Sequence, residues 1–286
     1  MKRYIRLKEL PPSTERFHTP SEEQIECSDS SLVVEPYICR VDDQGFMKTG
    51  FEGGSHLQPI VIMGDSFVES MYSAEELRFV SQVERNLNED SEKYRFLNAG
   101  YSGSTSLQLL NSLINKVYPT VGPGSTIVFF APHSDRDNLY KDGSYWNGSQ
   151  RGAALLPASG VGNPQLVHEI EAFSSVLTLL AAASKALQLN LILGTAPFRV
   201  ADFASDAPLR RLYRRSRENY ELGLQRRRAF CAEVRNFSRE NNLPLIDGEI
   251  ALAGDASYFY DELHLNSTGH EKFAEFVSPE LAKHLS

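Results

Sequence analysis

Short continuous apolar runs recur along the chain, and each is followed by glycine, proline or small polar residues. Runs of this kind are typical of strands that are buried on both faces of a sheet. The best example, Ile60–Met63, ends in Gly64-Asp65-Ser66, which stops the strand and turns the chain. We therefore predict strands over five ranges: 60–63, 94–98, 126–130, 190–195 and 244–247.

Between these strands, apolar residues recur at helical spacing. In 74–87 they are Leu77, Val80, Val83 and Leu87, and Ser73 is placed to cap that helix. Strands that alternate with amphipathic helices indicate βαβ units and a parallel sheet. Four further segments are predicted as helical: 106–117, 169–187, one or two helices in 209–241, and 271–285 with Ser267 or Thr268 as its cap.

Residues 1–56 have a different character, with Pro11-Pro12 and short alternating runs that indicate extended segments and turns. The stretch 41–46, which contains Gly45, predicts a hairpin. We expect this part to be an appendage that packs on the edge of a core domain over 57–286. No individual residue in it indicates carbohydrate binding.

Composition and charge exclude several classes of protein. A formal net charge of −8 argues against general binding of nucleic acids or anionic membranes, which both require a dominant positive field. The longest apolar runs are too short to span a bilayer, and the first residues lack the apolar core of a secretory signal, so we expect a cytoplasmic protein.

Cys27, Cys39 and Cys231 are odd in number and widely spaced. They are interpreted as thiols of a reducing compartment, with a Cys27–Cys39 disulfide as the less favoured alternative. No metal site or cofactor is predicted.

Two stretches far apart in the sequence carry catalytic chemistry. Ser66 follows a buried strand, and ligands gather at the carboxyl edge of an open α/β sheet. A serine hydroxyl becomes a good nucleophile when a histidine accepts its proton and a carboxylate orients that histidine. Asp261 and His264, three residues apart near the other end of the chain, fit these two roles.

Gly-Asp-Ser early in a domain and Asp-x-x-His late in it resemble the SGNH (GDSL) hydrolases. The block 97–103 is similar to that family's second block, whose glycine N–H helps to form an oxyanion hole. The resemblance implies a three-layer α/β/α, flavodoxin-like fold with a parallel sheet of about five strands. It also implies a Ser66–His264–Asp261 triad and an oxyanion hole from the N–H groups of Ser66 and Gly100.

The sequence departs from the family after the 126–130 strand. The family has an asparagine there that donates to the oxyanion, whereas this chain has His133. An imidazole N–H can also donate a hydrogen bond, so His133 is a candidate third donor. Asn138 is either a substitute donor or a residue that ties down its loop.

Substrate contacts are expected around a long loop, 133–164, that leaves the functional edge of the sheet. Tyr145 and Trp146 in this loop either form a platform for a sugar ring or acyl chain, or anchor the loop. Arg199 either holds an anionic group of the substrate or pairs with a surface acid. The complete set of substrate-binding candidates is Asp65, Asn138, Tyr145, Trp146 and Arg199.

Three functions fit these residues. The first is a serine esterase acting on a small acyl ester, expected to be acetyl, carried by a small molecule or a sugar. The second is an O-acyltransferase that uses the same acyl-enzyme. The third is a non-catalytic carbohydrate-binding protein in which His133 has replaced a required oxyanion donor. The sequence predicts no oligomeric state.

Overall fold

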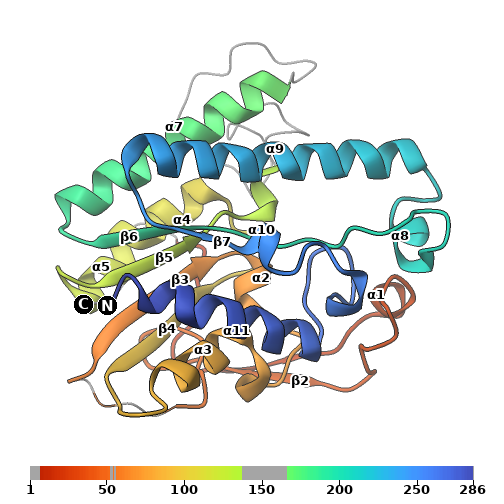
Figure 1. The fold of residues 1–286 in the computed structure, drawn as a ribbon. Coiled ribbons are helices and arrows are strands. Elements are labelled where there is room, and N and C mark those ends of the chain that lie inside the picture. Colours follow the sequence, from red (N-terminus) through yellow and green to blue (C-terminus); the bar gives the residue numbers. More distant parts are fainter. Residues whose placement is uncertain (1–6, 52–53, 55, 137–165, 286) are drawn as a thin grey trace.

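The computed structural model describes residues 7–51, 54, 56–136 and 166–285. Its centre is a five-stranded, entirely parallel sheet of order β4-β3-β5-β6-β7 (Figure 1). The predicted strands are all present, with ends that differ by a few residues at most. Their bounds are β3 Gln58–Gly64, β4 Tyr94–Gly100, β5 Thr126–Phe130, β6 Asn190–Thr195 and β7 Leu245–Asp247.

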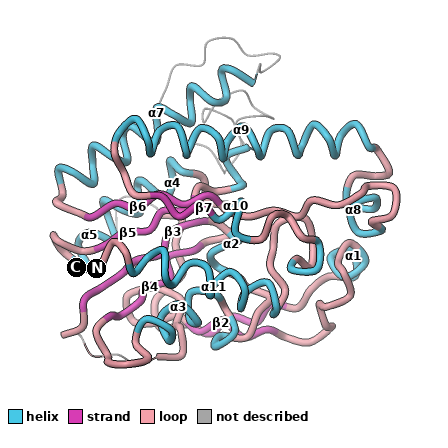
Figure 2. Tube along the Cα trace, in the orientation of Figure 1, coloured by secondary structure: helices cyan, strands magenta, loops and turns pink. Residues whose placement is uncertain are grey.

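Helices cover both faces of this sheet and create a three-layer α/β/α architecture (Figure 2). One face packs against α4, α7 and α9, and its core includes Leu113, Phe129, Phe173 and Phe230. The opposite face packs against α3 and α11. The helices of the first face are α4 Ser106–Ser112, with its continuation through the π-helical turn η2 Leu113–Val117 into α5 Tyr118–Val121, α7 Leu166–Ala186 and α9 Arg217–Asn241.

The remaining helices are short, apart from the two that cover the second face. They follow the carboxyl ends of strands or connect the longer helices. Their bounds are α2 Ser66–Glu69, η1 Glu75–Leu77, α3 Phe79–Leu87, α8 Ala207–Leu212, α10 Gly248–Ala251, η3 Ala256–Tyr258 and α11 Ser267–Ala282.

The helix predicted over 74–87 is interrupted, and the interruption has a physical cause. Arg78 adopts an extended backbone conformation between η1 and α3, and its side chain is completely buried. Its guanidinium donates to the carbonyl oxygens of Ser70 and Ile38 at 3.3 and 3.1 Å. Leu77 is therefore displaced from the predicted apolar face and is 41% exposed, and Ser73 does not cap either helix.

Two other helix predictions change in detail. The 209–241 segment divides into α8 and α9 because Arg214 and Arg215 both adopt left-handed backbone conformations, with φ of 50° and 65°. The last helix begins earlier than predicted. Its cap is Asn266, whose side chain accepts the N–H of Gly269 at 2.9 Å, and not Ser267 or Thr268.

The N-terminal part contributes a two-stranded antiparallel ribbon, β1 Glu15–His18 with β2 Tyr37–Arg40, and the short helix α1 Glu22–Glu26. The hairpin predicted at 41–46 is present. Val41 and Met47 form an antiparallel bridge across it, and Met47 also donates its N–H to the carbonyl of Asn98 at 3.0 Å. This contact places the segment along the outer edge of β4. Among the described helices, none is long and apolar enough to cross a membrane.

Candidate active site

The turn between β3 and α2 is held rigidly, and this turn presents Ser66. Asp65 caps α2 by accepting the N–H of Phe67 at 3.2 Å, while its other oxygen accepts both the N–H and the hydroxyl of Ser134 at 3.0 Å. A Cβ on Gly64 would lie 2.3 Å from Val68, so the close approach of strand and helix requires glycine. Both oxygens of the buried Asp65 are thus occupied by the protein, which assigns it to the turn and not to the substrate.

Ser66, His264 and Asp261 meet in one hydrogen-bonded row, although 198 residues separate the first two. The Oγ of Ser66 lies 2.8 Å from Nε2 of His264, and Nδ1 of His264 lies 2.7 Å from Oδ2 of Asp261. The second Asp261 oxygen accepts the N–H groups of Leu263 and His264, both at 2.8 Å. This geometry allows His264 to accept the serine proton while Asp261 fixes the ring orientation.

The electrostatics of the row favour this direction of proton transfer. Burial lowers the pKa of His264, but the charge and hydrogen bond of Asp261 outweigh burial and raise it above the ordinary value of 6.5. Burial raises the pKa of Asp261, and the contacts with His264 reverse that effect, so the carboxyl stays ionised. The ring of Tyr260 stacks on His264 with centroids 5.4 Å apart. The histidine is thus held both at its edge and on its face.

Glu262, inside the Asp261–His264 loop, is the anchor that sequence reasoning did not find. Its carboxylate accepts hydrogen bonds from the Tyr213 hydroxyl and from Nη2 of Arg227, whose side chain is 1% exposed. The backbone N–H of Arg199 donates to the Glu262 carbonyl at 2.9 Å. These contacts join the loop to residues 35 to 63 positions away, so no local pattern in the sequence could have indicated them.

Arg199 pairs with a buried acid and not with the surface acid considered for it. Its guanidinium is buried and pairs with the equally buried Asp206 at 2.5 and 2.8 Å, and it also donates to the carbonyls of Ala256 and Phe259. A guanidinium engaged in this way holds the loop after β6 against η3. Its acid partner is therefore buried and not at the surface.

The end of β4 differs from expectation. The N–H of Gly100, which was expected in the oxyanion hole, donates to Oδ1 of Asn98 at 2.9 Å. Gly100 is required for another reason, because a Cβ there would lie 2.2 Å from the backbone nitrogen of Glu69 in α2. Three residues on, Gly103 adopts a left-handed conformation with φ of 67°. Its N–H makes no hydrogen bond to any residue that the structure describes.

The turn that contains Gly103 is fixed beside the α2 helix. Glu69, at the end of α2, accepts the N–H of Ser102 at 2.6 Å and also its hydroxyl. The N–H of Tyr101 donates to the carbonyl of Gly64 at 3.1 Å. The ammonium of Lys8 donates to the Gly103 carbonyl. The turn is therefore tied to both ends of the β3–α2 segment that carries Ser66.

His133 lies near the row but has its Nε2 directed at the carbonyl oxygen of Pro197, 3.2 Å away. A carbonyl only accepts, so Nε2 carries a proton. Burial, followed by the charges of Arg227 and Arg136, holds the pKa of His133 well below its ordinary value, so the ring is neutral. A neutral ring with its proton on Nε2 has no proton on Nδ1. In this geometry His133 has no N–H to offer to an oxyanion.

Asn138, Tyr145 and Trp146 lie outside the described residues, as does most of the 133–164 loop. Within the described part of the chain, no group of histidine, cysteine, aspartate or glutamate side chains is arranged to hold a metal ion.

Solved structures that share this fold include a protein of the G-D-S-L family from Desulfitobacterium hafniense. TesA matches with 17% identity and a TM-score of 0.54, over 80% of this chain and 100% of its own. A catalytic mutant of Axe2, an acetylxylan esterase from Geobacillus stearothermophilus, matches with 17% identity and a TM-score of 0.52, over 81% and 96%. The lipase/acylhydrolase from Enterococcus faecalis matches with 19% identity and a TM-score of 0.52, over 80% and 98%.

No protein-family model and no curated protein sequence matches the chain. At these levels of identity the comparisons establish the fold, and it is that of the SGNH (GDSL) hydrolases. The architecture expected from the resemblance is confirmed.

Proposed function

We propose that this protein is a serine hydrolase of the SGNH type that cleaves a small acyl ester. One observation carries the proposal: the continuous row from the Ser66 hydroxyl through His264 to Asp261, with contacts of 2.8 and 2.7 Å. A serine that served only as a turn residue would not need a half-buried, carboxylate-oriented histidine at its hydroxyl. The row also argues against a protein that only binds carbohydrate.

In the proposed reaction, His264 takes the hydroxyl proton as Ser66 attacks the ester carbonyl. The imidazolium, stabilised by Asp261, then protonates the departing alcohol, and an acyl-serine remains. Water activated by the same His264 releases the acid. An O-acyltransferase would differ only in the last step, where a sugar hydroxyl replaces water.

For the oxyanion hole we propose the N–H groups of Ser66 and Gly103. Ser66 is the first residue of α2, where a helix N–H has no partner within the helix. Gly103 replaces Gly100 in this role because its N–H makes no bond in the described structure, and its turn is fixed to α2. His133 is left out because its proton is directed at Pro197.

The acyl group is proposed to be acetyl, carried by a carbohydrate. The support is that solved structures of the same fold include an acetylxylan esterase. The shared fold alone does not select this substrate, so the acyl group has to be measured with esters of increasing chain length on the same alcohol.

The test uses p-nitrophenyl acetate hydrolysis together with labelling by a fluorophosphonate and peptide mass spectrometry. Wild type should hydrolyse the ester and carry the label on Ser66, and Ser66→Ala should lose both. Ser175→Ala, a half-buried serine on α7, is the matched control and should retain both. An unlabelled Ser66, with equal rates for wild type and Ser66→Ala, would refute the hydrolase.

A further inference from the structure

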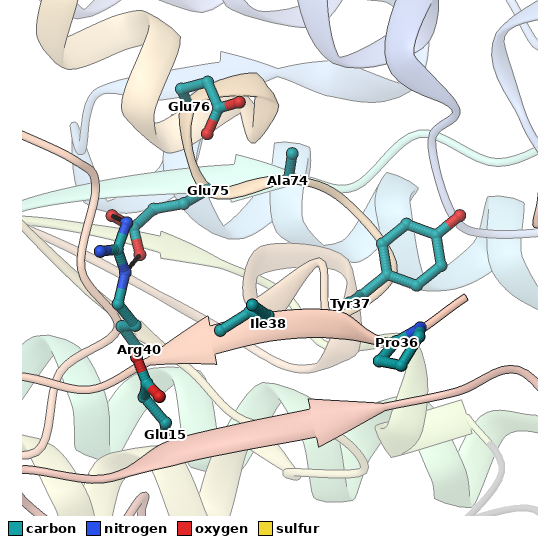
Figure 3. A pocket seen from close by; sticks show the side chains of 8 residues that line it. All are labelled: Glu15, Pro36, Tyr37, Ile38, Arg40, Ala74, Glu75 and Glu76. Atoms are coloured by element: carbon teal, nitrogen blue, oxygen red, sulfur yellow. Dashed lines mark hydrogen bonds and ion pairs between the residues drawn. The ribbon is translucent and has the colours of Figure 1, made fainter.

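A hollow that Ser66 does not line lies between the N-terminal ribbon and the segment at η1. Its volume is about 400 Å³, within the range of sites that hold small molecules. The ribbon supplies Glu15, Pro36, Tyr37, Ile38 and Arg40, and the segment at η1 supplies Ala74, Glu75 and Glu76 (Figure 3). These side chains belong neither to the Ser66–His264–Asp261 row nor to the core of the sheet.

The lining has an apolar end and a polar end. Figure 3 shows Tyr37 and Pro36 together at one end, with Ile38, which is 46% exposed, between them and the polar groups. At the other end, Arg40 forms a two-pronged pair with Glu75, with contacts of 3.1 and 3.0 Å. The carboxylate of Glu15 lies at this same end.

This combination matches the chemistry of a sugar ring. A pyranose or furanose has an apolar C–H face, which packs on an aromatic ring, and a rim of hydroxyls, which pair with carboxylates and guanidinium groups. The residues that line the hollow include three carboxylates, Glu15, Glu75 and Glu76, and one cation, Arg40. The surplus of negative charge favours an uncharged sugar over an acidic one.

A row of aromatic rings connects the hollow to the catalytic histidine. Tyr37 contacts Tyr72 with ring centroids 5.7 Å apart, Tyr72 contacts Tyr260 at 6.3 Å, and Tyr260 stacks on His264 at 5.4 Å. Tyr37 and Tyr72 are both half-buried, so each keeps exposed ring surface. Three ring contacts thus separate the hollow from His264. A sugar unit whose ester is at Ser66 could not also fill the hollow, but another unit of the same oligosaccharide could.

We infer that this hollow is a subsite for an uncharged sugar unit of an acylated oligosaccharide, whose ester-bearing unit lies at Ser66. The inference rests on the proposed hydrolase function and specifies its substrate as an oligomer. It also gives the N-terminal ribbon a role in selecting the substrate.

The experiment compares three substrates in steady-state kinetics: p-nitrophenyl acetate, an O-acetylated neutral xylo-oligosaccharide and an O-acetylated oligogalacturonate. Tyr37→Ala should raise KM for the neutral oligosaccharide about tenfold with kcat unchanged, because an aromatic contact is lost only from binding. Tyr37→Phe keeps the ring and should restore the wild-type KM. All Tyr37 variants should hydrolyse p-nitrophenyl acetate at the wild-type rate.

Charge is tested separately. The negative charge of the hollow should give the acidic oligomer a higher KM than the neutral one, and Glu76→Gln should narrow this difference. Glu271→Gln, which changes an exposed acid on α11, should leave the difference unchanged. Equal KM values for Tyr37→Ala and wild type on the neutral oligosaccharide would overturn the subsite.

A failure of the proposed hydrolase function can be distinguished from a failure of the proposed subsite. If wild type leaves all three esters intact, binding of the unacetylated xylo-oligosaccharide to wild type and Tyr37→Ala by calorimetry still decides the subsite. Weaker binding by the variant supports it, and equal or absent binding by wild type and variant refutes it.

Discussion

Asn98 and Gly100 close a small hydrogen-bonded ring at the end of β4, with the Gly100 N–H 2.9 Å from the Asn98 side-chain oxygen. The amide nitrogen of Asn98 in turn donates to the carbonyl of Val68 in α2 at 3.1 Å. Asn98 therefore joins β4 to the helix that begins with Ser66, and Gly100 permits the contact. The glycine that the sequence suggests for chemistry thus has a packing role, and for this reason we propose the donor in the turn beyond it.

The two glycines should respond differently to alanine. In Gly100→Ala the new Cβ would meet backbone atoms of α2, so we expect loss of several kcal/mol of stability, of the size of severe overpacking. In Gly103→Ala the Cβ meets only the flexible end of Lys8 at 3.2 Å, and the left-handed backbone costs an alanine about 1–2 kcal/mol. Gly103→Ala should therefore fold. Its kcat should fall by a larger factor than its KM changes. Thermal unfolding and steady-state kinetics of the two variants check these expectations. A Gly100→Ala protein as stable as wild type would contradict the packing role of Gly100.

The pH dependence of kcat/KM should report the raised pKa of His264. The reaction requires the neutral imidazole, so activity is lost as pH falls through this pKa, which Asp261 holds above 6.5. Asp261→Asn removes that charge, so the acid limb should move to lower pH while the maximal rate falls by orders of magnitude, about 10⁴-fold in a comparable triad. A pH–rate profile from pH 5 to 9 makes the comparison. An acid limb at the same pH in both proteins would show that another group controls it.

His133 should prove to be dispensable as an oxyanion donor. Loss of one such donor typically costs about 10²–10³-fold in kcat, whereas His133→Ala removes a contact with the Pro197 carbonyl and the edge-on packing of the ring against Phe67 and Phe198. We therefore expect His133→Ala to lower kcat by less than about tenfold, well short of that range. His133→Asn, which restores the family's residue, serves as the comparison. A hundredfold fall in kcat for the alanine variant at unchanged KM would instead identify the ring as a working donor.

Local patterns in the sequence predicted the sheet well because a buried parallel strand is a continuous apolar run. Residues 190–195 form β6 over the predicted range, and Ser66, Asp261 and His264 lie together as the motifs implied. Predictions were wrong where a distant partner decides the conformation. Arg78 breaks a helix because carbonyls from two other segments require its guanidinium.

The same cause accounts for the site residues that were misassigned or missed. Arg199 pairs with a buried acid, and Arg227 reaches Glu262 across 35 positions. In the 97–103 block, the Asn98 side chain occupies the N–H of Gly100, two residues away. The sequence does not show where that side chain points.

Glu84 provides a test of the structure that is independent of catalysis. It is buried between α3 and β4, where one oxygen accepts the N–H of Phe96 at 2.8 Å and the Thr49 side chain also hydrogen-bonds to the carboxylate. Burial raises its pKa from 4.5 to about 7, so the folded state binds the proton more tightly than the unfolded state. The stability that this proton contributes is complete below pH 4.5 and is lost as pH rises through about 7.

Glu84→Gln keeps an oxygen for Phe96 and cannot ionise, so it should remove this loss. Urea unfolding at pH 5 and pH 8 should show wild type losing about 2.5 kcal/mol relative to Glu84→Gln over that interval, because the pKa change from 4.5 to about 7 is worth about 3.4 kcal/mol in full and part of it is already lost at pH 5. Groups common to both proteins, including His264 and His270, cancel in the difference. Glu271→Gln, at an exposed position, should follow the wild-type pH dependence. If Glu84→Gln also follows it, the carboxyl is ionised in the folded protein, and the packing described between α3 and β4 is incorrect.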